Sequence, residues 1–377
     1  MELQRYEDLR LTEEGRRQIE SGEYFEDRKS SVEFKIINHP LIKKHSGTGA
    51  IVGSCNGLVC ISIPYTHHID DPIYICNPTL GEQITLPRFT LMVKNKNNVE
   101  YKKTTYLDGH LVSGFGYNTK TDEYKVVRIH YFVSRRSELS KGQVQVYTLG
   151  SGSGWRNKED ISYSLQRYYR CPTACLNRMR FSYNHVEEIC SPWRGILADG
   201  ALHWLDEEWN IVAFELAEEE FSLLPSPPCF RPGVVNFFTL QVLEERLCVA
   251  KGHDGDQLDI WSFKKETSEW ENMFSLSCHS DELMDMYWPI SLTLGGKLLL
   301  RSNYETLICY DPQTKEFKKQ IDLITSSLFE PLHHDYPLIE AIPHMNSLVS
   351  LKALGEKPKA MTRDSDLGDH FYEYGSE

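Results

Sequence analysis

The sequence of 377 residues lacks any apolar run long enough to cross a bilayer, and it has no excess of basic residues. A transmembrane helix needs about 18 or more consecutive apolar residues, so none is expected. Lys and Arg total 41 against 54 Asp and Glu, which gives a formal net charge of -13. Nucleic acids and anionic membranes are bound through basic surfaces, so neither is an expected partner.

Export signals are missing as well. The first 20 residues are too highly charged for a secretory signal, and no N-x-S/T glycosylation acceptor occurs. In such a chain the 10 cysteines are expected to be reduced thiols. These features predict a protein of the cytosol or the nucleus.

Motifs of the common enzyme classes are also missing. The sequence has no G-x-S-x-G nucleophile elbow, no H-E-x-x-H zinc motif, no P-loop and no G-x-G-x-x-G fingerprint. The run GSGSGW at 150–155 resembles the turn boxes of sialidase-type propellers, but it lacks their aspartate and is more typical of a flexible hairpin loop. We therefore expect no catalytic residues and no cofactor.

Metal sites can be assembled only from weak patterns. Four N/S ligands suffice for a structural zinc site, yet the candidate set does not follow the usual paired C-x2-C spacing. The segment 253–259 (HDGDQLD) matches only a fragment of a calcium loop, and the His pairs at 67–68 and 333–334 point to opposite faces of an extended chain. Scattered thiols and polar turns explain these residues better, so no metal is expected. The zinc candidates are Cys171, Cys175, His185 and Cys190.

The sequence does contain one hairpin pattern several times over, most clearly at 307–317 (LICYDPQTKEF). An aromatic residue ends the first strand, a turn of Asp, Pro and polar residues follows, and a second aromatic opens the returning strand. Asp followed by Pro favours a type I turn, and the two aromatics can meet across the strands, a contact of about 0.2–1 kcal/mol. Four pairs are seven residues apart: Tyr117/Tyr124, Phe214/Phe221, Phe263/Trp270 and Tyr310/Phe317.

Looser copies occur at Tyr147/Trp155 and, without aromatics, at 76–84 (CNPTLGEQI), and β-favouring runs precede each later hairpin. The later hairpins begin near positions 76, 147, 214, 263 and 310, so their last steps are 49 and 47 residues. The first two steps, of 71 and 67 residues, must contain insertions. Four short strands in roughly 40–50 residues are typical of a β-propeller blade. We predict an all-β, kelch-like β-propeller of about five to six four-stranded blades.

The chain divides into three parts on this prediction. Residues 1–44 form a short polar N-terminal segment with one weak helical stretch at 6–20, residues 45–352 form the propeller, and residues 353–377 form a disordered tail. A sixth blade can be completed from both chain ends by VEFKII at 32–37 and MNSLVSL at 345–351. The tryptophans that recur in the units are expected to pack in the blades, because a binding site rarely repeats in every unit. They are Trp155, Trp204, Trp261 and Trp270.

The insertion at 157–194 is unusual because it is rich in arginine and tyrosine in an acidic protein. Arg and Tyr are enriched at interface hot spots, so one hypothesis is that this loop contacts a protein partner. The alternative is that it forms blade strands whose arginines pair with surface carboxylates. The candidate partner-binding residues are Arg167, Tyr168, Tyr169, Arg170, Arg178, Arg180 and Tyr183.

Taken together, the motifs resemble the F-box-associated region of plant F-box proteins, a group that includes the S-locus F-box proteins of pollen. The resemblance runs from about residue 53 to 352. It rests on GSCNGLVCIS, IYICNPTLGEQITLP, GFGYNTKTDEYKVVRI, VQVYTLGSGSGWR, GILADGALHWL with IVAFELAEEEFSLLP, LDIWSF and SLVSLK.

This resemblance implies a non-catalytic substrate receptor of a Skp–cullin–F-box ubiquitin ligase, in which the propeller captures the protein to be ubiquitinated. In that family an N-terminal F-box docks the Skp-type adaptor, but residues 1–52 contain no such leucine- and proline-marked module. The expected partners are therefore a target protein, and the adaptor and cullin only if an F-box is supplied elsewhere. S-locus-type pollen recognition is one form of this role. The alternatives are a decoy or scaffold that binds a partner without delivering it, a sugar-binding propeller, and a glycosidase- or lyase-type propeller with clustered carboxylates near its axis.

Overall fold

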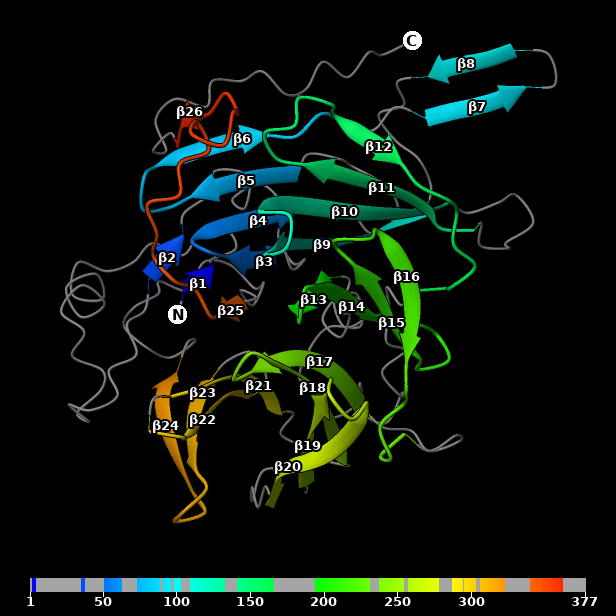
Figure 1. Ribbon diagram of the computed structural model, residues 1–377. Coiled ribbons are helices and arrows are strands. Elements are labelled where there is room, and N and C mark those ends of the chain that lie inside the picture. Colours follow the sequence, from blue (N-terminus) through cyan, green and yellow to red (C-terminus); the bar gives the residue numbers. More distant parts are fainter. Residues whose placement is uncertain are drawn as a thin grey trace, which may run out of the picture.

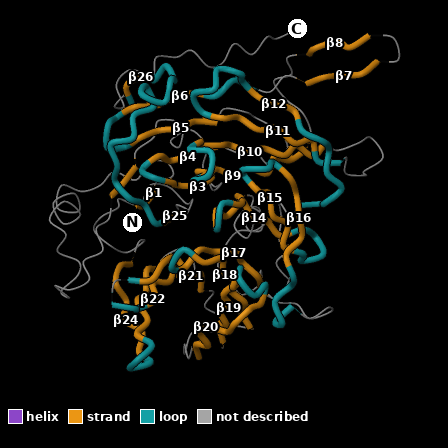
Figure 2. The backbone as a smooth tube through the Cα atoms, viewed as in Figure 1, coloured by secondary structure: helices purple, strands orange, loops and turns teal. Residues whose placement is uncertain are grey.

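The protein is described from a computed structural model. It is built from strands, and within the described ranges we find no helix and thus none long and apolar enough to cross a membrane (Figures 1 and 2). The predicted N-terminal helix at 6–20 lies outside these ranges. The structure describes residues 2–4, 35–37, 51–62, 73–88, 91–95, 98–102, 109–132, 141–165, 194–230, 237–253, 257–277, 287–293, 295–302, 306–322 and 340–361.

Five four-stranded antiparallel units follow one another along the described chain, each built as a meander from its inner to its outer strand. The first unit contains β3 (Ile51–Cys55), β4 (Leu58–Ser62), β5 (Ile73–Asn77) and β6 (Glu82–Thr85). The second contains β9 (Gly109–Asn118), β10 (Glu123–Phe132), β11 (Gln143–Thr148) and β12 (Trp155–Asn157). The third contains β13 (Arg194–Ala198), β14 (Ala201–Leu205), β15 (Ile211–Glu215) and β16 (Glu220–Leu224).

The fourth unit contains β17 (Phe237–Leu243), β18 (Arg246–His253), β19 (Gln257–Lys264) and β20 (Glu269–Ser277), and the fifth β21 (Tyr287–Leu292), β22 (Leu298–Ser302), β23 (Thr306–Asp311) and β24 (Glu316–Asp322). Figure 1 shows these units as curled sheets whose first strands face the centre of the molecule. A separate hairpin, β7 (Leu91–Asn95) and β8 (Asn98–Lys102), lies within the first predicted insertion. The predicted all-β propeller architecture is confirmed.

The repeated aromatic hairpins form as predicted. In all five aromatic pairs the two residues are direct cross-strand partners, with ring centroids between 4.7 Å and 5.4 Å apart. The turn chemistry is also present: Asp311 Oδ1 accepts a hydrogen bond from the Gln313 backbone at 2.9 Å, and Asn77 Oδ1 accepts one from the Thr79 backbone at 2.8 Å. Local turn preference and cross-strand contact therefore define each outer hairpin.

Trp204 joins the second and third units in the core. The parallel pairing of β9 with β13 merges these units into one eight-stranded sheet, and Gly114 and Gly195 are partners in that pairing. A Cβ atom at Gly195 would come within 2.5 Å of the Trp204 ring, so the glycine lets β13 approach the indole. Trp204 is 1% exposed, and its Nε1 donates to the Ser113 carbonyl at 3.3 Å. The prediction that the tryptophans pack in the blades is confirmed here and for the partly buried Trp155, Trp261 and Trp270.

The two chain ends meet in a small sheet of β2 (Lys35–Ile37), β1 (Glu2–Gln4) and β25 (Glu340–Ile342). The N-terminal segment VEFKII contributes β2 to this sheet, so both chain regions share one sheet as predicted, but β1 lies between β2 and the C-terminal strand, which is 340–342. The predicted strand at 345–351 is wrong, because residues 345–350 form no strand and residue 351 begins a turn. Carbonyls of this segment instead accept hydrogen bonds from a side chain of the first unit.

We call residues 343–361 the C-terminal strap, which crosses the first unit (Figure 1). The Asn77 side-chain amide donates to the carbonyls of Ser347 at 3.1 Å and Val349 at 2.8 Å, and Glu82 accepts from the Leu351 backbone at 2.7 Å. The strap ends in β26 (Lys359–Ala360), which pairs with β6. Disorder predicted from residue 353 is therefore wrong for 353–361, because these hydrogen bonds hold a segment that has no apolar periodicity.

Candidate functional site

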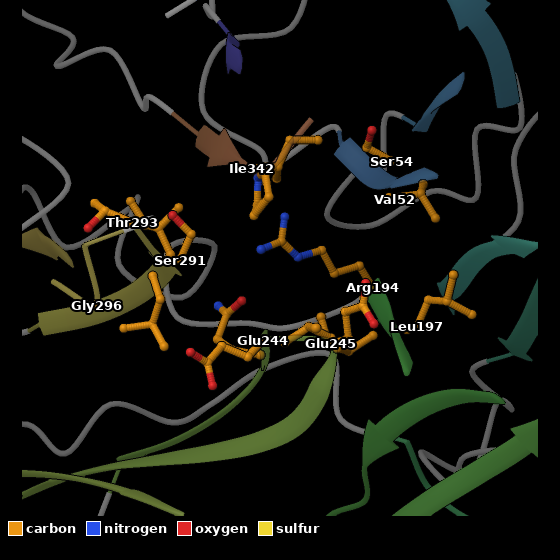
Figure 3. Close-up of a pocket in the computed structure, with 18 residues that line it drawn as sticks. Val52, Ser54, Arg194, Leu197, Glu244, Glu245, Ser291, Thr293, Gly296 and Ile342 are labelled. Carbon is orange, nitrogen blue, oxygen red and sulfur yellow. The ribbon is translucent and has the colours of Figure 1, made fainter. Parts of the chain in front are cut away.

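A cavity of about 660 Å³ lies where the inner strands of several units meet. Its wall is contributed by β3, by the first residues of β13, by the ends of β17 and β21 with their turns, and by β25 with the start of the strap (Figure 3). Most of the lining is apolar, including Val52, Ile196, Ile290 and Ile342. Charged groups in such a place are costly unless they are paired, so each one in the wall needs a physical explanation.

Arg194 is the cationic group of this cavity. It is the first residue of β13, and its neighbour Gly195 fixes the strand against Trp204. The half-buried side chain extends into the cavity between Ile342 and Glu244 (Figure 3). Its side chain makes no hydrogen bond or ion pair with a described residue. The described part of the chain therefore leaves its five N–H donors available to a ligand.

Two glutamates form the anionic side. Glu244 and Glu245 are the two loop residues between β17 and β18, with φ of 49° and 64°. The corresponding turns of the first and third units use Asn56-Gly57 and Asp199-Gly200, the residue types that this geometry favours. Glutamate in the left-handed region costs roughly 1–2 kcal/mol per residue. The turn therefore keeps two carboxylates in this position against a local conformational preference.

Only one of these carboxylates has a partner in the described part of the chain. Glu244 Oε2 accepts from Arg246 at 3.1 Å, a pair in which both side chains are well exposed. Glu245 is exposed at the cavity wall and has no hydrogen bond or ion pair with a described residue. Among the described residues, the wall thus contains one cation and one carboxylate without a partner, which favours binding of a ligand that carries both charges.

Neutral polar groups complete the wall. Ser54 Oγ and His344 Nδ1 lie 2.8 Å apart, which joins β3 to the strap. Thr293 Oγ1 accepts from the Lys297 backbone at 3.1 Å and so fixes the turn after β21. Ser291 also faces the cavity (Figure 3). Hydroxyls beside apolar side chains are suited to hydrogen bonding with a peptide backbone or with polar side chains.

An ion cluster around the buried Glu219 holds the second and third units together. Glu219, in the turn between β15 and β16, pairs with Lys125 Nζ at 2.9 Å, Arg156 Nη1 at 2.8 Å and Lys158 Nζ at 3.2 Å. Burial alone would raise the pKa of the Glu219 carboxyl, but hydrogen bonds from Arg156 and Lys125 and the charge of Lys125 outweigh it and lower the pKa to about 2. The carboxylate is therefore ionised throughout the physiological range.

Two tryptophans of outer strands make the same contact between neighbouring units. Trp155 Nε1 donates to the Pro87 carbonyl at 2.6 Å, and Trp270 Nε1 donates to the Pro225 carbonyl at 2.7 Å. Each proline follows the outer strand of the preceding unit. The cavity wall is thus supported by repeated contacts that restrain one unit against the next.

The sequence-based candidates for the site are not the residues that form this cavity. The arginine- and tyrosine-rich cluster at 167–183 and the zinc candidates at 171–190 lie outside the described residues, so both stay predictions. Of the calcium candidates, Asp259 accepts hydrogen bonds from Gln257 and Ser275. Within the described ranges, no group of three or more His, Cys, Asp or Glu side chains is arranged to hold a metal.

The residues that sequence reasoning missed are Arg194, Glu244 and Glu245. Arg194 has no sequence motif, because its importance comes from the strand that it begins. The glutamates had a signal: the turn in VLEERL carries Glu-Glu where sister turns carry Asn-Gly or Asp-Gly. A comparison of turn residues across the repeated units would have singled them out.

Comparison with known proteins agrees with this architecture. A family model described as "F-box associated beta propeller domain" matches residues 24–326, and the chain belongs to this family. F-box protein At3g07870 of Arabidopsis thaliana is 27% identical over 307 residues, which cover 71% of this chain and 64% of that protein. F-box protein CPR1 of the same plant is 25% identical over 296 residues, covering 74% and 65% respectively.

The chain thus spans slightly less than two thirds of the length of these curated relatives. Another relative, the F-box/kelch-repeat protein At3g23880 of Arabidopsis thaliana, is 26% identical over 66% of this chain and 58% of its own length. Among solved structures, an oligogalacturonate lyase in complex with manganese matches with a TM-score of 0.36 at 10% identity, over 74% of this chain and 79% of that one. A similarity at that level supports no conclusion about activity.

Proposed function

We propose that this chain is the substrate-recognition part of a Skp–cullin–F-box ubiquitin ligase and that it is itself non-catalytic. The observation that carries the proposal is membership of the F-box-associated propeller family over residues 24–326, together with a charged central cavity on a rigid frame. The named relatives are F-box proteins, which supports the same role for this chain.

In this mechanism the propeller binds a target protein and the ligase partners supply the chemistry. The strands hold the cavity and the surrounding loops in fixed positions, so that binding does not require the receptor to become ordered first. The Skp-type adaptor and the cullin join through an F-box, carried by the same polypeptide or by an associated one. The arginine- and tyrosine-rich segment at 167–183 belongs to this proposal as a second contact with the target.

Two finer points extend the proposal. The receptor acts in the cytosol or the nucleus, in the same compartment as its target proteins. The location of a fluorescent fusion in plant cells tests this. Recognition of the S-locus type requires expression in pollen, which transcript measurement in pollen and in leaf tests.

The experiment that tests the proposed function distinguishes binding of target proteins from their delivery to the ubiquitin ligase. The chain is expressed in Arabidopsis cells alone and fused behind the F-box segment of At3g07870, with the proteasome inhibited in both cases. We expect both forms to retain the same proteins, and these proteins to carry more ubiquitin when they are captured by the fusion. Equal ubiquitin on both captured sets would refute delivery, and longer lifetimes of the captured proteins would identify a decoy.

A further inference from the structure

We infer that the central cavity is the site where a short peptide of the target binds, and that Arg194 recognises a carboxylate of that peptide. The inference rests on the proposed function and specifies its substrate class. It concerns the charged groups of the wall described above. The ligand is thus a peptide segment with a carboxylate, and with a basic group for Glu245.

The state of Arg194 points to an anionic ligand. A half-buried guanidinium without a partner has lost part of its hydration and has received no compensating hydrogen bond from the described residues. Carboxylates match the planar guanidinium in a bidentate arrangement, which gives both directionality and stronger, charge-assisted hydrogen bonds. The apolar side chains around it lower the local dielectric, so that a pair formed here is stronger than one at an exposed surface.

The Glu244-Glu245 turn points to a basic group in the same ligand. Strained backbone that persists in a fold tends to occur at functional positions, and here the strained residues are those whose carboxylates reach the cavity wall. Asn-Gly would satisfy the turn without these charges. The Glu-Glu pair therefore adds negative charge to the cavity wall that also contains the Arg194 cation, and this combination selects peptides with both signs of charge.

The size of the cavity limits the ligand. A volume of about 660 Å³ is within the range of roughly 300–1,000 Å³ that is typical of small-ligand pockets. Such a space admits a few residues of an extended chain and excludes a folded surface. Either a free C-terminus or an internal Asp or Glu side chain supplies the required carboxylate.

The test uses the full chain and an array of hexapeptides in which Lys, Arg, Asp, Glu, Gly and Leu are varied at every position. One copy of the array ends in free carboxylates and a second copy is C-terminally amidated. We expect retained spots that combine a carboxylate with a Lys or Arg. Loss of all retained spots on the amidated copy would assign the C-terminus, and retention of Asp- or Glu-containing amidated spots would assign a side chain.

Variants then connect binding to the cavity. For the most strongly retained peptide, calorimetry is expected to show at least a tenfold loss of affinity for Arg194→Gln and a severalfold loss for Glu245→Gln. Lys120→Gln, which removes a cation that is 72% exposed outside the cavity, is the control and is expected to bind within twofold of the wild type. Thermal unfolding checks that each variant is folded.

Two results would overturn the inference: no retained peptide on either array, or equal affinity of the wild type and Arg194→Gln. Ubiquitination by the fused Arg194→Gln variant distinguishes a wrong cavity assignment from a wrong proposed function. If Arg194→Gln fused to an F-box still ubiquitinates the same captured proteins, the receptor role stands and only the cavity assignment is wrong.

Discussion

Replacement of Glu219 by Gln tests how the second and third units are held together. The substitution keeps the size of the side chain and the left-handed backbone, which has φ of 58°, and removes only the charge. Lys125 and Glu219 are 4% and 8% exposed, so the variant leaves a buried lysine without its closest carboxylate. Breaking a buried pair in this way is destabilising because the remaining charge stays desolvated.

The magnitude follows from the pKa of Glu219. A decrease from the ordinary value of 4.5 to about 2 corresponds to roughly 3 kcal/mol at about 1.4 kcal/mol per unit. Arg156 and Lys158 are 40% and 33% exposed, so solvent screening reduces this to about 2 kcal/mol. We expect Glu219→Gln to lower the free energy of unfolding by about that amount at pH 7.

The pH dependence provides a second check. Because the folded-state pKa of Glu219 is depressed, its contribution is fully present above about pH 4.5 and is lost as the pH falls through about 2. The difference between the wild type and Glu219→Gln should therefore shrink as the pH falls below about 4.5. Urea unfolding followed by tryptophan fluorescence at a series of pH values measures it.

The matched control is the neighbouring Glu218→Gln. Glu218 is 53% exposed and, among the described residues, pairs only with the exposed Lys120 at 3.4 Å, so its loss should cost less than about 0.5 kcal/mol. Equal unfolding free energies for Glu218→Gln and Glu219→Gln would refute the reasoning, since burial would then make no difference to the ion cluster.

Three further predictions concern the strap, the outer tryptophans and the strained turn. Asn77→Asp keeps the acceptor of its turn but cannot donate to the strap carbonyls, so trypsin should cleave after Lys352 and Lys359 faster than in the wild type; equal cleavage would contradict the strap contacts. Trp155→Phe and Trp270→Phe remove the indole donors to proline carbonyls and should each cost about 0.5–1.5 kcal/mol in urea unfolding, with no change speaking against these contacts. Replacing Glu244-Glu245 by Asn-Gly should stabilise the fold by about 1–2 kcal/mol while weakening peptide binding, and a loss of stability would contradict the strain argument.

The propeller could be predicted because its signal is local and repeated. An aromatic before a five- or six-residue turn and an aromatic after it, as in Tyr310 and Phe317, determine a hairpin from a few neighbouring residues. Repetition then implies the larger array. No tertiary contact has to be known in advance for this inference.

The attachment of the C-terminal strap and the position of the cavity could not be predicted, because both depend on contacts between residues that are distant in the sequence. The strap is held by the Asn77 side chain and by Glu82, which lie more than 260 positions away in the sequence. Arg194 acquires its role from the packing of Gly195 on Trp204, which places the start of β13 at the cavity. Neither relation leaves a periodic pattern in the sequence.

The most direct test of the central claim is the lifetime of the captured proteins. Proteins retained by the chain in Arabidopsis cells are identified, and their half-lives are measured with and without the chain carrying an F-box. We expect a defined set of these proteins to be degraded faster when the F-box fusion is present, and proteasome inhibition to abolish the difference. Unchanged half-lives of the whole captured set would contradict a role in substrate recognition for a ubiquitin ligase.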